Sequence, residues 1–332
     1  MMRELPEADA RLVEGVLRAE RRAIAKSITL LESTRADHRA RAHALLECLL
    51  PHTGKSVRLG ISGVPGVGKS TFIEALGMYL IRHGHKVAVL AVDPSSSLTG
   101  GSILGDKTRM EKLSVAPEAY IRPSPSAGSL GGVAARTRES MLVCEAAGYD
   151  IVIVETVGVG QSETAVAGMT DMFVLLQLPN AGDDLQAIKK GIVELADLVV
   201  FNKCDIDARA AQLAMGQMRG ALGLLRAHAA DWRTPVIGIS ALAGEGLDGF
   251  WSEVRRFRDS MQQAGAWAAR RRRQAADWTW SLIDQGLRAR FNEHAEVRAL
   301  LAELMRRVEC GDTTPGAAAD RLLAAFTGHG GP

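Results

Sequence analysis

The sequence predicts an α/β fold with a mainly parallel sheet between two layers of helices, and further helical segments at both ends of the chain. Between residues 57 and 250, short and nearly continuous apolar runs alternate with helical stretches. This pattern is typical of parallel strands that are buried on both faces. Elsewhere apolar residues recur at helical spacing, and no strand pattern follows Gly246. We therefore expect a helical extension at 1–56, an α/β domain at 57–260 and a helical arm at 261–332.

The composition excludes several classes of protein. With 332 residues, 47% of them apolar, the chain is long enough for a full core and is neither a disulfide scaffold nor a disordered chain. Its formal charge of +2 is too balanced for generic binding to nucleic acid or to an anionic membrane. Its longest apolar stretches are far shorter than the ~20 residues that cross a bilayer. We expect neither nucleic acid nor a membrane as a partner.

Cysteine usage and the acidic N-terminal segment indicate a cytoplasmic protein. The four cysteines stand too far apart to form a CxxC unit: Cys48, Cys144, Cys204 and Cys310. Free thiols in a reducing compartment are therefore expected. Acidic residues between Glu4 and Glu14 distinguish the N-terminal segment from a secretory signal and from an organelle transit peptide.

The elements follow in chain order. Apolar residues at helical spacing within residues 7–50 predict two helices, which Pro51 and Gly54 close. Six apolar runs predict the strands: Val57–Ile61, Val87–Val92, Ile151–Val154, Met172–Leu178, Leu198–Phe201 and Val236–Ile239. In the arm, the basic run Arg270–Arg273 is expected to be a solvated helical face or a partner contact. The arm's tryptophans Trp267, Trp278 and Trp280 anchor a dimer or pack within the arm, and we favour a subunit interface.

The strongest motif follows the first expected strand and opens a helix. It fits the phosphate-loop pattern G-x-x-x-x-G-K-[ST] with the residues Gly63, Val64, Pro65, Gly66, Val67, Gly68, Lys69, Ser70 and Thr71. Its glycines let successive backbone N–H groups converge on phosphate oxygens, Lys69 reaches the outer phosphates, and the Ser70 hydroxyl ligates magnesium. A chance match in a chain of this composition has a probability of roughly one percent.

A second motif, Asn202-Lys203-Cys204-Asp205, follows the expected strand Leu198–Phe201, in the position where P-loop GTPases carry N-K-x-D. The Asp205 carboxylate can accept hydrogen bonds from the N1–H and 2-amino group of guanine, a pattern that adenine cannot supply, while the Lys203 stem covers the base. A strand-ending Asn and a helix-capping Asp would look the same in isolation. An accessory base-binding loop is expected at Ser240, Ala241 and Leu242.

Acidic residues at or beyond the ends of expected strands suggest a metal site. Glu155 directly follows the third run, at a strand end where it can hold magnesium through water, and Gly158 lets a backbone N–H approach the γ-phosphate. Most such GTPases have Asp where this chain has Glu155. Asp93 follows the second run and Asp106 lies in a Gly-rich segment, and either could complete the metal shell or position water. A helix cap or a turn is the alternative role of each.

Three further stretches make the chain resemble the MeaB/ArgK family of P-loop GTPases: Asp93–Ser96, Glu155–Gln161 and Gly182–Gly191. The resemblance covers almost the whole chain, including both helical ends. It implies a homodimeric GTPase chaperone that gates cofactor loading into adenosylcobalamin-dependent methylmalonyl-CoA mutase and protects or reactivates it.

The resemblance also implies site roles. GTP or GDP and Mg²⁺ are the expected cofactors. Ser70, Asp93, Asp106 and Glu155 would surround the metal, and the catalytic set would be Lys69, Asp93, Asp106, Glu155 and Gly158. The segment Pro179–Lys190 resembles the family's third switch, with Asp183 and Lys189 as its ionic residues; an ordinary charged helix start is the alternative. Gln161 lies near the second switch and receives no role.

Three other functions remain open. A metal-insertion GTPase of the nickel-chaperone kind shares this topology but typically displays His-rich or Cys-centred ligands, which are absent here. A small-molecule kinase would transfer phosphate from the same loop, as the older description of the family as an arginine/ornithine transport kinase implies. A scaffold with a structural nucleotide would show no multiple turnover.

Overall fold

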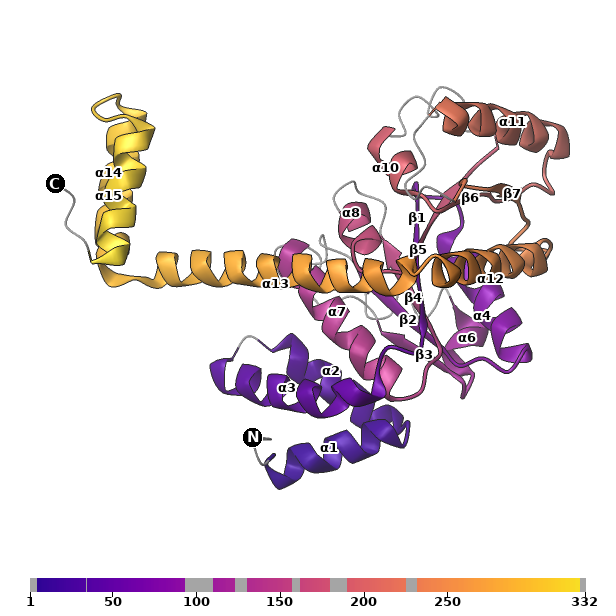
Figure 1. Cartoon of the computed structure of the whole chain (residues 1–332), viewed down its shortest axis with the longest axis horizontal. Helices are drawn as coiled ribbons and strands as arrows, with labels where there is room; N and C mark the ends of the chain where they lie inside the picture. Colours follow the sequence, from indigo (N-terminus) through magenta and orange to yellow (C-terminus); the bar gives the residue numbers. More distant parts are fainter. Residues whose placement is uncertain are drawn as a thin grey trace. The chain divides into compact units, whose positions relative to one another are not determined.

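A computed structural model describes residues 5–33, 35–92, 110–122, 130–156, 162–179, 190–224 and 232–328 (Figure 1). The chain forms two compact units, Met1–Gln274 and Ala275–Pro332. Among the described residues, no helix is long and apolar enough to span a membrane.

The centre of the first unit is a seven-stranded sheet with the order β3-β2-β4-β1-β5-β6-β7, in which every strand pair is parallel. The strands are β1 Val57–Gly63, β2 Val87–Val92, β3 Ala119–Arg122, β4 Ile151–Thr156, β5 Met172–Gln177, β6 Leu198–Phe201 and β7 Val236–Gly238. All six expected strands are present, so the parallel α/β fold is confirmed. The edge strand β3 was not predicted. Because all strands run the same way, their carboxyl ends meet at one edge of the sheet.

Helices cover both faces, which confirms the three layers. The helices of the first unit are α1 Glu7–Leu17, α2 Arg21–Glu32, α3 Ala36–Leu49, α4 Lys69–Arg82, α6 Glu111–Val115, α7 Leu130–Ala146, α8 Ser162–Ala167, α10 Lys190–Leu195, α11 Ala208–Leu224 and α12 Leu247–Gln263. On one face, α4, α6 and α12 pack around Leu59, Ile61 and Phe250. On the other, α7, α8, α10 and α11 cover alternate residues such as Val152 and Leu175.

The N-terminal extension contains three α-helices and a short 3-10 helix, Leu50–His52, where two helices were expected. The first break is at Ala19, which takes a φ of +59° while the Glu20 N–H bonds the Gly15 carbonyl at 2.9 Å. This closes α1 as a left-handed cap without the glycine that normally marks one. The extension packs mainly on α7 (Figure 1).

The second unit is helical throughout its described residues, as expected. Helix α13, Ala266–Glu293, runs from the first unit into the second, where α14, Ala295–Glu309, and α15, Pro315–Thr327, follow. Helices α14 and α15 pack around Val297, Leu304 and Leu322.

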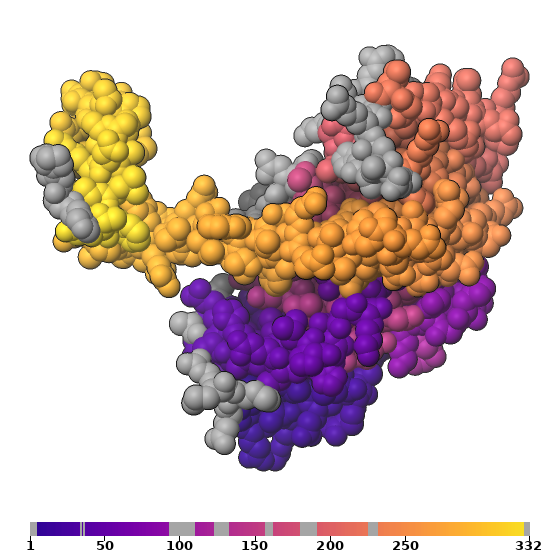
Figure 2. Space-filling view, viewed as in Figure 1, coloured from indigo at the N-terminus to yellow at the C-terminus, as the bar shows by residue number. Residues whose placement is uncertain are grey.

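The amino edge of the sheet is held by three buried carboxylates, each paired with a guanidinium group. Arg271 bonds Asp171 at 2.7 and 2.6 Å, and Arg270 bonds Asp197 at 2.9 and 3.1 Å. Arg58 bonds Glu145 at 2.6 and 3.0 Å. The basic run at the start of α13 was expected to be a solvated face or a partner contact. Two of its arginines instead join the start of α13 to the sheet within the first unit, whose surface is part of the view in Figure 2.

Candidate functional site

The phosphate-loop motif lies between β1 and α4, at the carboxyl edge of the sheet. Two glycines are required there by close approach. A Cβ on Gly63 would stand 2.7 Å from the Leu176 carbonyl oxygen. Gly68 has a φ of +92°, and a Cβ there would stand 2.7 Å from Asn202 Nδ2. The motif therefore turns tightly against β5 and against the Asn202 loop, with Val67 fully buried beneath it.

Lys69 and the acidic end of β4 face one another across this loop. The Lys69 ammonium donates to the carbonyl oxygens of Gly63, at 2.7 Å, and Val64, at 3.3 Å. The Ser70 hydroxyl lies 3.3 Å from Glu155 Oε1. Burial lowers the pKa of Lys69, and the negative charges of Glu155 and Glu163 oppose that shift. The structure thus brings together the lysine, the hydroxyl and a buried carboxylate.

Glu163 is a residue that the sequence reasoning did not single out. It lies in the first turn of α8, is only 2% exposed, and its charge acts on Lys69. The stretch that contains it follows the acidic strand end Glu155 closely in sequence. An acidic residue so soon after that strand end was the available signal, but only the fold shows that it is buried near the phosphate loop.

The N-K-x-D residues follow β6 and contact the phosphate loop directly. The buried Asn202 side chain donates to the Val67 carbonyl at 2.8 Å and accepts from the Ala241 N–H at 3.0 Å. Lys203, at a φ of +63°, donates from its ammonium to the Gly66 carbonyl at 3.0 Å. Asp205 is exposed in the turn that follows. One side chain therefore joins three loops into a single hydrogen-bonded unit.

The expected accessory loop follows β7. Backbone bonds of 3.1 and 3.0 Å between Ser240 and Glu245 close it. Ala241 is buried against Asn202, whereas the Leu242 side chain is 87% exposed. The loop therefore presents one exposed apolar side chain, and its backbone is joined to the N-K-x-D residues through Asn202.

Several expected site residues lie outside the described part of the chain. Asp93, Asp106 and Gly158 are among them, as are Gln161 and nearly all of the segment Pro179–Lys190, including Asp183 and Lys189. In the sequence, each of these residues comes after a strand whose carboxyl end lies at the phosphate-loop edge, and before the next element of the chain. Among the residues that are described, no group of three or more His, Cys, Asp or Glu is arranged to hold a metal ion.

Comparison with known proteins identifies the family. The sequence profile described as "Methylmalonyl Co-A mutase-associated GTPase MeaB" matches residues 24–296. The chain belongs to the MeaB family of P-loop GTPases. A Caulobacter vibrioides protein described as a GTPase is 54% identical over 323 residues, which is 97% of this chain and 98% of its own length.

Two further relatives show how far the similarity extends. A Mus musculus protein, "Methylmalonic aciduria type A homolog, mitochondrial", is 48% identical over 95% of this chain and 79% of its own. The crystal structure of an "LAO/AO transport system kinase" has a TM-score of 0.78 at 36% identity and covers 98% of this chain and all of its own. The family membership implies binding of a guanine nucleotide and hydrolysis of GTP.

Proposed function

We propose that this GTPase is a chaperone of an adenosylcobalamin-dependent methylmalonyl-CoA mutase and gates its cofactor loading, protection or reactivation. The observation that carries the proposal is the match to a mutase-associated family over residues 24–296. The joined phosphate and N-K-x-D loops support a site that responds to guanine nucleotide. A change at one loop is transmitted to the others through Asn202, which suits a protein that signals its nucleotide state.

Magnesium fits the described residues and is part of this proposal. The Ser70 hydroxyl and the Glu155 carboxylate present two oxygens 3.3 Å apart, and Mg²⁺ prefers oxygen ligands completed by water and phosphate. Asp93 and Asp106 are proposed as further acidic groups of this site. Magnesium would neutralise charge on the phosphates when bound. Lys69 stabilises the charge that develops on the outer phosphates, and the Gly158 N–H is proposed to meet the γ-phosphate.

The same proposal assigns the selection of guanine to Asp205. Lys203 and the Ser240–Leu242 loop support the base. The carboxylate offers only acceptors, which match the two donors on the guanine edge. Its exposure at the end of the joined loops leaves it accessible to a base.

We further propose that the protein is a homodimer held by its arm. No residue of α13 is buried, and Trp280, Ile283 and Leu287 are 67, 41 and 50% exposed at the spacing of one helical face. Large apolar side chains gathered in this way are typical of subunit interfaces. Ending the chain after Gln274 should give a monomer that binds GTP with unchanged affinity, since that end keeps Arg270 and Arg271 in place. Light scattering measures the mass; a dimer of the shortened chain would show that the interface lies elsewhere.

The chaperone proposal is tested with purified mutase. Size-exclusion chromatography of the GTPase and the mutase, with GDP or a non-hydrolysable GTP analogue, should show a complex whose stability differs between the two nucleotides. Transfer of adenosylcobalamin to the apo-mutase should then depend on the nucleotide, and Lys69→Ala should bind the mutase without turnover. A mutase that forms no complex under either condition would contradict the proposal.

A small-molecule kinase is the alternative that the name of the structural relative suggests. It predicts ATP use and a phosphorylated acceptor, whereas the Asp205 arrangement predicts GTP preference. Hydrolysis rates with GTP and ATP, together with mass spectrometry for phosphorylated amino acids, separate the two functions.

A further inference from the structure

Side chains from α7 and α13 bond to the end of the short helix α8. Gln274 Nε2 donates to the Thr170 carbonyl at 2.8 Å and to the Ala167 carbonyl at 3.4 Å. Arg138 donates from Nη2 to the Gly168 carbonyl at 2.9 Å and from Nη1 to the Gln274 carbonyl at 3.0 Å. The last carbonyl groups of a helix lack partners within it. These two side chains supply the missing donors and join the end of α8 to α13; we call this set of bonds the α8 junction.

The other end of α8 lies near the phosphate loop. Its first two residues, Ser162 and Glu163, are 0 and 2% exposed, and the Glu163 charge acts on Lys69. Between its two ends the helix lies directly on β1, the strand that leads into the phosphate loop: a Cβ on Gly60 would stand 2.8 Å from Val166 Cγ1. One helix of six residues therefore connects the α8 junction with the surroundings of the phosphate-binding lysine.

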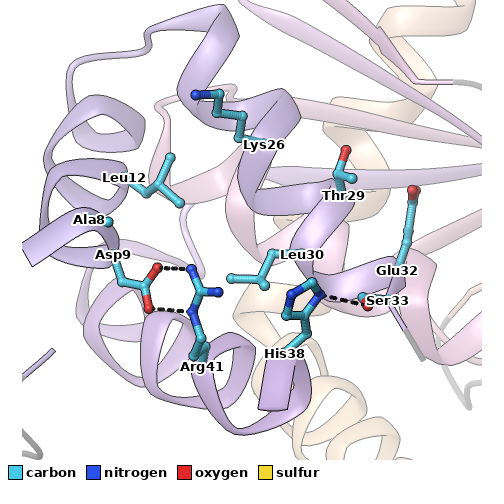
Figure 3. A pocket seen from close by; sticks show the side chains of 10 residues that line it. All are labelled: Ala8, Asp9, Leu12, Lys26, Thr29, Leu30, Glu32, Ser33, His38 and Arg41. Atoms are coloured by element: carbon cyan, nitrogen blue, oxygen red, sulfur yellow. Dashed lines mark hydrogen bonds and ion pairs between the residues drawn. The ribbon is translucent and has the colours of Figure 1, made fainter. Parts of the chain in front are cut away.

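Both elements that supply the donors are held by contacts outside the nucleotide site. Helix α7 packs on α2 and α3 of the N-terminal extension. The extension is itself joined across α1 and α3 by a buried ion pair, in which both oxygens of Asp9 accept bonds from Arg41, at 2.9 and 2.7 Å (Figure 3). On the other side, Arg270 and Arg271 join the start of α13 to the sheet. The α8 junction therefore fixes the end of α8 to two supported helices.

The position of α8 depends on these contacts, because a helix of six residues is not stable by itself. Catalysis by positioned groups is sensitive to displacements of about 1 Å. A shift of α8 would move the Glu163 charge relative to Lys69, the cation that stabilises the outer phosphates. Arg271, in contrast, bonds Asp171 and the backbone just before β1, neither of which belongs to α8. The α8 junction is thus distinct from the ion pairs that fasten α13.

We propose that Gln274 is a positioning residue for GTP hydrolysis: through its bonds to the end of α8 it holds the first turn of that helix, and with it Glu163, in place near Lys69. Arg138 supports the same arrangement from α7. The first part of the arm helix α13 thus carries a residue that acts on turnover, although it belongs to neither the phosphate loop nor the N-K-x-D motif. The inference concerns the hydrolysis of GTP and does not depend on the proposed mutase partner.

Steady-state hydrolysis by the full chain tests this proposal. Gln274→Glu keeps the shape of the side chain but places a carboxylate oxygen where Nε2 donates. It should lower kcat about tenfold and change KM by less than about twofold, because the groups that bind the nucleotide are unaltered. Gln285→Glu is the matched control, since Gln285 lies on the same helix and bonds Ser281 of that helix.

A second variant keeps the donor. The Gln274 Oε1 atom has no hydrogen-bond partner within the described part of the chain, so the donor carries the contact. Gln274→Lys offers an ammonium to the same carbonyl groups and should retain most of the wild-type kcat. Should Gln274→Glu not fold, Gln274→Ala, which removes the donor without adding a charge, takes its place in each comparison.

Hydrogen exchange distinguishes a displaced α8 from a general loss of stability. The amides of residues 162–170 should exchange faster in Gln274→Glu than in the wild type, whereas those of β1 and β6 should exchange at the wild-type rate. Urea unfolding gives the stability of each variant.

Four results would overturn the proposal. The first two are a wild-type kcat in Gln274→Glu and an equal loss of kcat in Gln285→Glu. The others are a Gln274→Lys variant as slow as Gln274→Glu, and faster exchange spread evenly over the sheet, since each of these indicates a purely structural role.

Discussion

At the carboxyl edge of the sheet, polar side chains bond mainly to the backbone of neighbouring loops, whereas at the amino edge buried carboxylates bond to guanidinium groups from distant segments. Lys69, Asn202 and Lys203 all donate to carbonyl oxygens of the phosphate loop. Asp171 and Asp197 instead receive Arg271 and Arg270, 100 and 73 residues away. The comparison separates two tasks: the first edge shapes a ligand site, and the second fastens the start of α13 to the sheet.

The largest effect is expected on hydrolysis at the carboxyl edge. Lys69→Ala should lower the rate of GTP hydrolysis at least ~100-fold, because among the described residues Lys69 is the cation that donates to the Gly63 and Val64 carbonyls. Its free energy of unfolding should change little, since Lys69 is an ammonium whose burial already disfavours its charge. Phosphate release and denaturant unfolding measure the two quantities. A variant with the wild-type rate would contradict the assignment of the phosphate loop.

The amino edge should respond in the opposite way. Arg271→Ala leaves the 2% exposed Asp171 carboxylate without its cation and should cost about 3–5 kcal/mol of unfolding free energy. Turnover of the protein that remains folded should stay near the wild-type value. Arg272→Ala is the matched control, since Arg272 is exposed on the same turn of α13. Equal stability of the two variants would show that the pair does not fasten the helix.

Base selection gives the third test. Asp205→Asn replaces an acceptor with a donor, and should weaken GTP binding by about 2–4 kcal/mol through the loss of two charge-assisted bonds. Xanthine carries a carbonyl where guanine has the 2-amino group, so the variant should gain affinity for XTP. Titration of the wild-type protein and the variant with GTP and with XTP measures the four affinities. Wild-type GTP affinity without a gain for XTP would favour a helix-capping role.

The smallest effect concerns Glu139, a half-buried carboxylate whose pKa is raised although an arginine lies near it. Burial raises the pKa of Glu139 to about 7, with Arg136 acting in the opposite direction. The folded state thus keeps this proton up to about pH 7, while the unfolded state releases it near its ordinary value. The contribution of Glu139 to stability is therefore present at low pH and is lost as the pH rises through 7, by about 2 kcal/mol.

Glu139→Gln should remove this pH dependence, which urea unfolding at pH 5 and pH 8 measures. Glu145 on the same helix provides the contrast. Burial alone would raise its pKa, but the bonds from Arg58, Ser56 and the Gly54 N–H lower it. An unchanged difference between the two pH values in Glu139→Gln would locate the titrating group elsewhere.

The sequence predicted the strands best where they are long and continuously apolar. It missed β3, Ala119–Arg122, because four residues between two prolines carry no periodic signal and the strand is held only along one side by β2. It also missed the break at Ala19, since an alanine in the left-handed region has no mark in the sequence. Local sequence patterns therefore predict elements that carry a long apolar signal of their own. They do not predict elements whose position depends on contacts with distant residues.

The site could be predicted only in part, because sequence patterns identify contiguous motifs but not contacts between distant residues. The phosphate-loop and N-K-x-D motifs are contiguous, so their residues could be named from spacing. The contact of Asn202 with Val67 spans 135 residues, and no spacing rule predicts it. The same limit applies to the basic run of α13: Arg270 and Arg271 pair with Asp197 and Asp171 at the sheet, whereas Arg272 and Arg273 are exposed as a solvated face would be.

The double role of Asn202 has a consequence for nucleotide energetics. Because one amide supports both the Val67 carbonyl and the Ala241 N–H, the phosphate loop and the base loop cannot be altered independently. Substitutions at the two ends of the nucleotide should therefore be non-additive in a double-mutant cycle while Asn202 is present. In an Asn202→Ala background the effects of the same two substitutions should become closer to additive. A single amide would then determine how strongly the identity of the base influences the affinity for the phosphates.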